Sequence, residues 1–290
     1  MTPVAEALAA TLGLPVVPAG RVGGGSIHGG RRFESARGPL FVKIASIEEA
    51  PLLAAEADGL AALAATGTVR VPAVLDRGVA GPHAYLALEW LGLEAPGAKS
   101  EAALGVGLAA LHRHTAPRFG FASDNFIGRT PQANAWCEDP VEFLASRRLG
   151  PQLALAARRG HAGPLTERGA RLLEQLPAFF RDYRPVASLL HGDLWGGNHA
   201  ALAGGTPVIY DPAVYYGDRE AELAMTRLFG GFSARFHAAY ADAWPLDAGA
   251  RARTGLHELY HLLNHLNLFG GGYAAPALER IERLTAELRR

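Results

Sequence analysis

The spacing of hydrophobic and polar positions is mostly typical of strands before Gly92 and mostly typical of helices after it. In the first part, a short helix is predicted over 4–12 and a longer one from Ile47 to Ala65, ended by Gly67. Short apolar runs bounded by Gly and Pro predict strands after Pro15 and at 32–34, 40–44, 71–76 and 84–90. The first part is therefore expected to be a small sheet accompanied by helices.

After Gly92, long segments rich in Ala, Leu and Arg have helical spacing. They predict helices over 100–114, 140–159, 164–182, 217–229, 233–243, 250–268 and 276–289. Short β-like runs interrupt these helices at 189–190, 199–202 and 207–211. The pattern predicts an α+β, bilobal fold, with a small β-rich N-lobe over 1–91, a larger and mostly helical C-lobe over 92–290, and a cleft between the lobes.

Composition narrows the classes of partner. The 28 Lys and Arg balance 28 Asp and Glu, so the net charge of +0 argues against charge-driven binding to nucleic acid or membranes. Cys137 is the single cysteine, which excludes an intramolecular disulfide and a cysteine-built metal site. The first residues show no basic stretch followed by a long apolar core, so we expect no secretory signal, and no uninterrupted apolar run approaches the roughly 20 residues that span a bilayer. We expect a soluble cytoplasmic protein that is a monomer or a weak dimer.

Candidate chemistry is concentrated in the run His191–Asn198, with the sequence HGDLWGGN, and in the following VIYDP. Asp193 and Asn198 are five positions apart, and Asp211 ends the next apolar strand. Phosphoryl transfer from ATP needs a group that orients the attacking hydroxyl and oxygen ligands for Mg²⁺. The spacing predicts Asp193 as the catalytic base and Asn198 and Asp211 as metal ligands. A turn would explain Asp193 and Asn198 alone, but the strand that leads to Asp211 favours the kinase interpretation.

Two upstream residues match the nucleotide side of such a site. Lys43 lies in the apolar run FVKI, a strand from which a lysine could reach the α- and β-phosphates of ATP. Glu56 lies in the predicted helix that follows, where its carboxylate could hold Lys43 in place. Each residue alone would be taken for an ordinary surface group, but their order before the 191–198 run favours an ATP-binding role.

Two further segments are candidates for nucleotide contacts. Gly24, Gly25 and Ser26 belong to a glycine run whose backbone N–H groups could approach phosphate closely. This run is neither a Walker A sequence nor a good match to the protein-kinase glycine loop, and runs of this kind are usually turns. Glu89 and Leu91 lie where the strands give way to helices, the place for a hinge that offers backbone hydrogen bonds to adenine.

With these motifs in order, nearly the whole chain resembles the fructosamine kinase (ketosamine-3-kinase) family, a branch of the protein-kinase-like fold related to aminoglycoside phosphotransferases. Further segments that carry the resemblance are 124–136 (DNFIGRTPQANAW), 211–232 and 259–273. The resemblance implies phosphorylation of the C3 hydroxyl of ketosamines, such as fructosamine or ribulosamine on lysine amines, with ATP and Mg²⁺. The product is implied to release the free amine, so glycated proteins are candidate partners and deglycation the implied role.

Several residues are candidates for the acceptor side, each with a structural alternative. The indole of Trp195 could pack against a sugar face, or it could only pack its own loop. Asn125 could bind sugar or brace a loop, and Tyr215 could shape the substrate side or anchor the segment after Asp211. His265 could line the cleft or belong to the core.

Two features qualify the resemblance. Many family members have a cysteine where Ser26 stands, so a thiol switch in this loop is not expected here. The run His257-Glu-Leu-Tyr-His261 formally matches a zinc-protease pattern, but it falls in an amphipathic helix inside a family segment that needs no metal. A kinase for aminoglycosides, choline or another small alcohol remains the alternative function. A pseudokinase is disfavoured because the residues assigned to catalysis are present.

Overall fold

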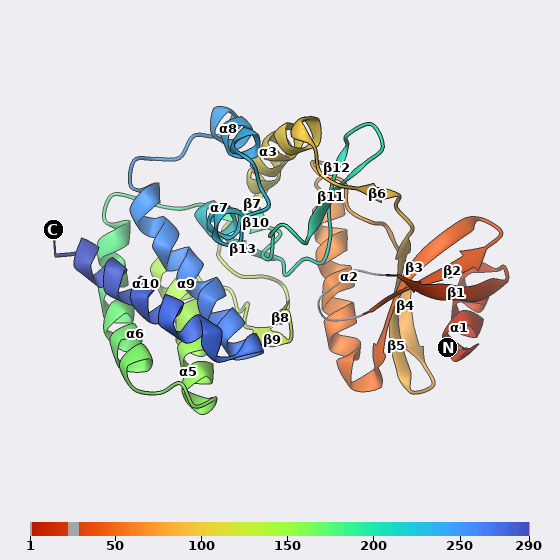
Figure 1. The fold of residues 1–290 in the computed structure, drawn as a ribbon, viewed down its shortest axis with the longest axis horizontal. Helices are drawn as coiled ribbons and strands as arrows, with labels where there is room; N and C mark the ends of the chain where they lie inside the picture. Colours follow the sequence, from red (N-terminus) through yellow and green to blue (C-terminus); the bar gives the residue numbers. More distant parts are fainter. Residues whose placement is uncertain (1, 23–28, 290) are drawn as a thin grey trace.

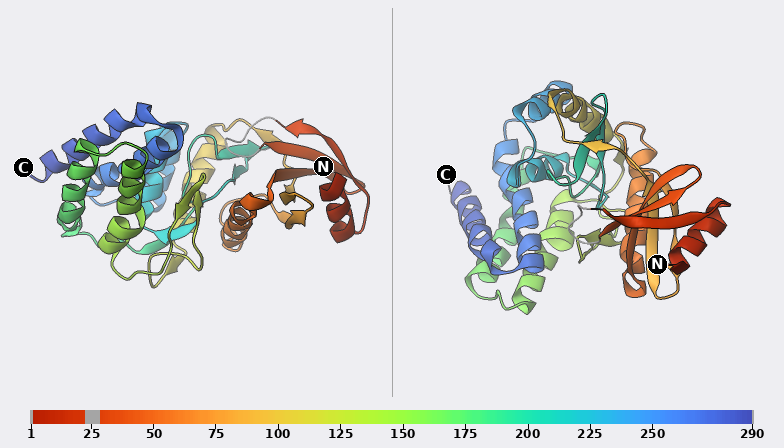
Figure 2. Two further views of the ribbon diagram at one scale, coloured as in Figure 1. Left: turned by 90° about the horizontal axis from the view of Figure 1, so that it is seen from below. Right: turned by 45° about the vertical axis from the view of Figure 1, so that its right-hand side comes forward.

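The computed structural model describes residues 2–22 and 29–289, which form a β-rich part and a helical part (Figure 1). The β-rich part is a five-stranded antiparallel sheet with the order β1-β2-β3-β5-β4. Its strands are β1 (Val16–Val22), β2 (Gly30–Ser35), β3 (Gly38–Ser46), β4 (Val74–Ala80) and β5 (His83–Glu89). This sheet and the helical part lie at opposite ends of the molecule in both views of Figure 2.

Helices α1 (Thr2–Leu12) and α2 (Ala50–Ala64) cover opposite faces of this sheet. Alternation along β5 explains the arrangement, because successive side chains of a strand point to opposite faces. Tyr85 packs in the apolar cluster that includes α1, and its neighbour Leu86 packs in the cluster that includes α2. A proline in the first turn starts α2, where the missing N–H costs no hydrogen bond. The central strands β3 and β5 therefore have buried side chains on both faces, while β1 and β4 at the edges are largely exposed.

The helical part is built around α9 (Ala250–Phe269), which packs against helices on several sides. Leu256, Leu259 and Leu263 of α9 are fully buried in its core. Gly270, at φ 92°, ends α9 in a backbone conformation that glycine adopts readily. The other helices are α3 (Ala98–His112), α4 (Pro140–Phe143), α5 (Gly150–Arg158), α6 (Pro164–Gln175), α7 (Arg219–Leu228), α8 (Ala234–Ala243) and α10 (Ala274–Glu287).

Short strands join the two parts. Two three-stranded sheets have the orders β12-β11-β6 and β13-β10-β7, and β8 pairs with β9 in a hairpin. These strands are β6 (Leu93–Glu94), β7 (Thr115–Ala116), β8 (Asn125–Ile127), β9 (Thr130–Gln132), β10 (Ala187–Leu190), β11 (His199–Leu202), β12 (Pro207–Ile209) and β13 (Tyr215–Gly217). They place the loop 191–198 and the segment 211–214 beside α2 and the N-terminal sheet (Figure 1).

The predicted α+β fold, with a β-rich first part and a helical second part, is confirmed, and three prolines explain its main local differences. Pro72 delays the strand expected at 71–76, which begins at Val74. Pro151, which lacks an N–H, follows a π-helical turn over Leu144–Leu149, so the helix expected over 140–159 is divided. Pro177 follows the end of α6, and the rest of 164–182 is a 3₁₀ turn over Leu176–Phe180.

The lobe boundary placed after Leu91 stays a prediction, and β6 directly beyond it already pairs with β11. Within 2–22 and 29–289, none of the helices combines the length and the apolar character that crossing a bilayer requires.

Candidate active site

The loop between β10 and β11 brings Asp193 and Asn198 together. The Asn198 amide nitrogen donates to the backbone oxygen of Asp193 at 2.8 Å and lies 3.4 Å from its carboxylate. The backbone N–H of Asn198 donates to Trp195 O at 2.9 Å, which tightens the turn between them. Because the amide nitrogen is engaged in this way, the oxygen of Asn198 is the atom left to bind a cation.

The hairpin of β11 and β12 then delivers Asp211 to the same place. His199 pairs with Ile209 across the hairpin, and Tyr210 N donates to Asn198 O at 3.1 Å. The backbone at Asp211 has φ 58°, and it is the one non-glycine residue with positive φ within 2–22 and 29–289. This left-handed conformation is costly for a side-chain-bearing residue and is typical of functional segments.

Lys43 of β3 joins the two parts of the molecule at this point. Its ammonium donates to Glu56 of α2 at 2.7 Å and to the Asp211 carboxylate at 2.6 Å. Burial lowers the pKa of Lys43, but the charges of Glu56 and Asp211 outweigh this effect and raise the pKa. Lys43 is therefore a fixed cation, only 6% exposed, between the N-terminal sheet and the segment that carries Asp211.

These five side chains line one pocket. Its walls come from β3, α2, the β8–β9 hairpin, the 191–198 loop and the segment after Asp211: Lys43, Leu52, Ala55, Glu56, Asn125, Phe126, Gly128, Asp193, Asn198, Asp211, Pro212 and Ala213. Burial, followed by the charges of Asp211 and Glu222, raises the pKa of Asp193 to about 7. The pocket thus gathers carboxylate and amide oxygens, the ligand type that suits Mg²⁺, and one lysine.

Glu222 of α7, which the sequence did not single out, supports the loop 191–198. Its fully buried carboxylate accepts the backbone N–H of His191 at 2.6 Å and that of Gly192 at 2.9 Å. His112 of α3 lies 3.4 Å from the same carboxylate. The hydrogen bonds from His191 and Gly192 lower the free energy of the ionised carboxylate, and they fix the backbone that leads directly into Asp193.

Of the residues expected to contact adenine and phosphate, those expected near adenine lie within the described structure, and the glycine run does not. The Glu89 carboxylate is engaged by Arg70 and by the N–H of Ala73 at 2.9 Å, and the Glu89 N–H donates to Ala73 O at 2.9 Å. Glu89 is the last residue of β5, and Leu91 lies in the connection that leads to the helical part. Gly24, Gly25 and Ser26 lie outside the described residues, and their role stays a prediction.

Of the four acceptor-side candidates, Asn125 lines the pocket, but its amide bonds to protein. It donates to Val214 O at 2.7 Å and accepts from Gln132 and Asn134 at 2.8 Å each. These bonds match the loop-bracing alternative. Trp195 lies in the loop 191–198 but is not among the residues that line the pocket, and its indole packs so closely on Gly197 that a Cβ there would be 2.3 Å from the ring.

The structure does not bring Tyr215 or His265 to this pocket. The Tyr215 ring is buried, with the Arg148 guanidinium 4.0 Å from its centre, and it packs in a cluster below the sheet of β10 and β13. His265 hydrogen-bonds to His261 O at 2.9 Å, and its ring lies 4.3 Å from that of Phe229. Tyr215 therefore has the contacts of a core residue, and His265 is half-buried beside the end of α9.

Known proteins identify the family. The sequence model for "Fructosamine kinase" matches residues 1–287. The chain belongs to the fructosamine kinase family. It is 42% identical over 283 residues to a "Probable ketoamine kinase" of Synechocystis sp., covering 97% of this chain and 95% of the relative. It is also 35% identical over 295 residues to the "Ketosamine-3-kinase" of Mus musculus, covering 92% and 94% of the two chains.

Solved structures agree with this membership in the fructosamine kinase family. A crystal structure from Thermobifida fusca, assigned as a fructosamine-3-kinase, superposes with a TM-score of 0.88 at 32% identity and covers 99% of each chain. The aminoglycoside phosphotransferase APH(4)-Ia superposes with a TM-score of 0.63 at 16% identity, covering 98% of each chain, and shares the fold. The protein-kinase-like fold class is thereby confirmed. This fructosamine kinase family member is a phosphotransferase that acts on a hydroxyl group, and its family and fold imply ATP as the donor.

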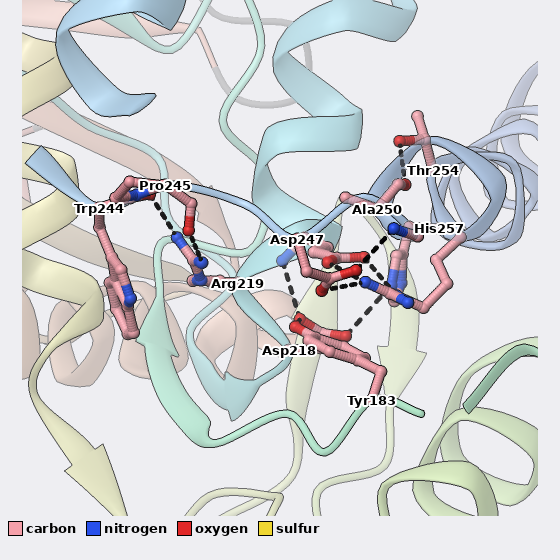
Figure 3. Close-up of polar contacts among 12 residues, drawn as sticks. Tyr183, Asp218, Arg219, Trp244, Pro245, Asp247, Ala250, Thr254 and His257 are labelled. Atoms are coloured by element: carbon pink, nitrogen blue, oxygen red, sulfur yellow. Dashed lines mark hydrogen bonds and ion pairs between the residues drawn. The ribbon is translucent and has the colours of Figure 1, made fainter. Parts of the chain in front are cut away.

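The run His257–His261, which formally matches a zinc-protease pattern, is not part of the pocket that Lys43 and Asp211 line. His257 lies close to Asp218 and Glu220, and these three could in principle hold a metal ion. However, the Arg253 guanidinium donates to both oxygens of Glu220, at 2.7 and 2.8 Å, and Tyr183 donates to Asp218 at 2.9 Å. His257 and Asp218 face each other in Figure 3. The His257 Nε2 lies 3.6 Å from Asp218 Oδ2. With Arg253 already neutralising Glu220, the cluster is an ion-pair network that joins α7 to α9.

Proposed function

We propose that this protein is an ATP-dependent kinase that phosphorylates the C3 hydroxyl of ketosamines, such as fructosamine or ribulosamine on lysine amines. The observation that carries the proposal is the meeting of Asp193, Asn198, Asp211 and Lys43 around one pocket between the lobes. Relatives named ketoamine kinase, protein-ribulosamine 3-kinase and ketosamine-3-kinase support the acceptor class.

In this proposal, each side chain has one task. Asp193 orients the acceptor hydroxyl and takes its proton, for which its raised pKa of about 7 suits it. Lys43, fixed by Glu56, binds the donor phosphates. Asn198 and Asp211 would hold Mg²⁺, which would neutralise the charge that develops on the phosphates.

The remaining nucleotide contacts in the proposal use the backbone. The segment Glu89–Leu91 offers its remaining peptide groups to adenine, while the Glu89 N–H stays bonded to Ala73 O and its carboxylate to Arg70. The loop of Gly24, Gly25 and Ser26 approaches the phosphates through its N–H groups. Trp195, two residues after the base, would limit which acceptors reach Asp193, and its indole suits the apolar face of a sugar.

The biological consequence that we propose is deglycation. Phosphate placed on C3 becomes a leaving group next to the carbonyl carbon of the ketosamine. Loss of a proton from C1 and of inorganic phosphate from C3 would leave an imine, and water would hydrolyse this imine to the free amine and a deoxy-dicarbonyl sugar. Lysine side chains of glycated proteins would then be returned to their unmodified form. The N-lobe over 1–91 would bind ATP, and the C-lobe over 92–290 would supply the catalytic loop and the acceptor site.

A single assay tests the acceptor class. ADP formation would be measured with ribulosyl-, erythrulosyl- and fructosyl-lysine, and in parallel with kanamycin and choline. We expect turnover of at least one ketosamine, an NMR signal for phosphate on C3, and release of free lysine as the product ages. Turnover of kanamycin or choline alone would reject the ketosamine proposal in favour of a general small-alcohol kinase, and phosphate at another carbon would reject the C3 assignment.

A further inference from the structure

The β8–β9 hairpin sends two buried amides into the segment that follows Asp211. Asn125 of β8 donates to Val214 O at 2.7 Å, and Gln132 of β9 donates to Ala213 O at 3.1 Å. Gln132 also donates to the Asn125 side-chain oxygen at 2.8 Å, so the two amides form one unit. This unit therefore hydrogen-bonds to the backbone carbonyls two and three residues beyond Asp211, the proposed metal ligand.

The segment 211–214 keeps its conformation through contacts with the surrounding structure. Asp211 has a φ of 58°, a conformation that a side-chain-bearing residue keeps only when neighbours enforce it. On one side, Ala213 N donates to His191 O at 2.8 Å. On another side the segment packs against α2, where a Cβ on Gly59 would lie 3.1 Å from Pro212. The hairpin amides close the remaining side.

The two amides are themselves held rigidly. Tyr260 of α9 donates to the Gln132 side-chain oxygen at 2.7 Å. Asn134 donates to the Asn125 oxygen at 2.8 Å and accepts from Arg148 at 2.8 Å. Asn125, Gln132 and Asn134 are at most 4% exposed, so a rotated amide would leave buried polar atoms unsatisfied. The orientation of the Gln132 donor is thus fixed from α9, and that of the Asn125 donor through Asn134 and Arg148.

We propose that Asn125 and Gln132 are positioning residues that hold Asp211 in the conformation that binds the metal-bound nucleotide. The inference rests on the proposed function, in which Asp211 is a Mg²⁺ ligand. Neither amide needs to touch ATP or the acceptor, because each acts through a backbone carbonyl of the segment 211–214. The hairpin also reaches the other lobe, since Arg129 at its tip bonds to Glu49 at 3.1 Å.

The test compares Gln132→Met with Asn267→Leu. Both amides are buried at 2% exposure or less and both bond to other side chains, but Asn267 bonds to Gln152 and not to the segment 211–214. Calorimetry would measure ADP affinity with Mg²⁺ and, separately, with EDTA. We expect Gln132→Met to weaken binding about tenfold with Mg²⁺, or about 1.4 kcal/mol, and to leave binding in EDTA unchanged. Asn267→Leu should match the wild type in both conditions.

Tyr260→Phe provides a milder test that does not depend on the folding of Gln132→Met. It removes only the hydroxyl that orients Gln132, and we expect a loss of about threefold with Mg²⁺ and none in EDTA, within the range of one neutral hydrogen bond. Equal weakening with and without Mg²⁺, or wild-type affinity in both variants, would overturn the positioning role. ADP binding that ignores Mg²⁺ in the wild type would reject the proposed metal site, and the positioning role with it.

Discussion

Glu222 offers the sharpest test of how the loop 191–198, the proposed catalytic loop, is held in place. The substitution Glu222→Gln keeps the volume of the side chain but replaces one of its two acceptor oxygens with an NH₂ group. In the native protein the two oxygens accept from His191 N at 2.6 Å and Gly192 N at 2.9 Å. The variant amide can accept one of these bonds, and its NH₂ group then faces the other backbone donor.

The magnitude follows from the burial of this carboxylate, which is 0% exposed. A hydrogen bond to a charged group contributes about 1.5–3 kcal/mol, and a buried donor left unsatisfied costs about 1–3 kcal/mol. One bond is lost and one weakened, so we expect the free energy of unfolding to fall by about 2–4 kcal/mol. That is less than the total stability of about 5–15 kcal/mol typical of a folded protein.

We also expect a lower kcat, because Asp193 follows Gly192 directly in the chain and would move with its backbone. A displacement of about 1 Å in a catalytic group can cost about 100-fold in rate, and we expect a kcat loss of that order. Urea unfolding and steady-state phosphotransfer would be measured for this variant and for Glu174→Gln, an exposed control on α6. A change in stability below about 1 kcal/mol, together with wild-type kcat, would refute the reasoning.

Three further predictions concern the base, a buried histidine and the metal. Asp193→Asn should lower kcat by about 10²–10⁴-fold with little change in the KM for ATP, and an unchanged rate would show that another group is the base. Burial, followed by the charges of His265 and His257, lowers the pKa of His261 to about 3, so His261 is neutral in the folded protein while the unfolded chain takes up a proton below pH about 6.5. The free energy of unfolding should therefore fall by about 1 kcal/mol from this residue between pH 7 and 5.5, and His261→Leu should remove that part of the slope in urea titrations. Protein washed with EDTA and returned to Mg²⁺ alone should recover full phosphotransfer, and a zinc requirement would contradict our interpretation of the His257 cluster.

The fold was predictable wherever one local pattern decides the structure. The helix expected over 250–268 is α9, and the strand expected at 199–202 is β11, because a long amphipathic period or a short apolar run determines each. The two-residue strand β6 was not predictable, since Leu93–Glu94 is a strand only through its pairing with β11, far along the chain. The β8–β9 hairpin was recognisable in sequence only as part of a family segment.

In the candidate site, residues whose type is limited by the chemistry of phosphoryl transfer could be predicted from the sequence. Residues that act through tertiary contacts could not. Asp193, Asn198 and Asp211 could be picked from the sequence because phosphoryl transfer limits their residue types and spacing. Glu222 could not, because a glutamate in the polar segment Arg219–Leu228 looks like an ordinary solvated helix residue.

The structure buries eight consecutive residues of that helix, Arg219 to Thr226, so its charged side chains must find partners inside the protein. Glu220 pairs with Arg253, which leaves Glu222, two positions along and on another face, to meet the N–H groups of the catalytic loop. A polar helix that lies within a family-specific segment but is buried on all sides is therefore the signal that would have pointed to Glu222. Only the tertiary contacts supply its burial.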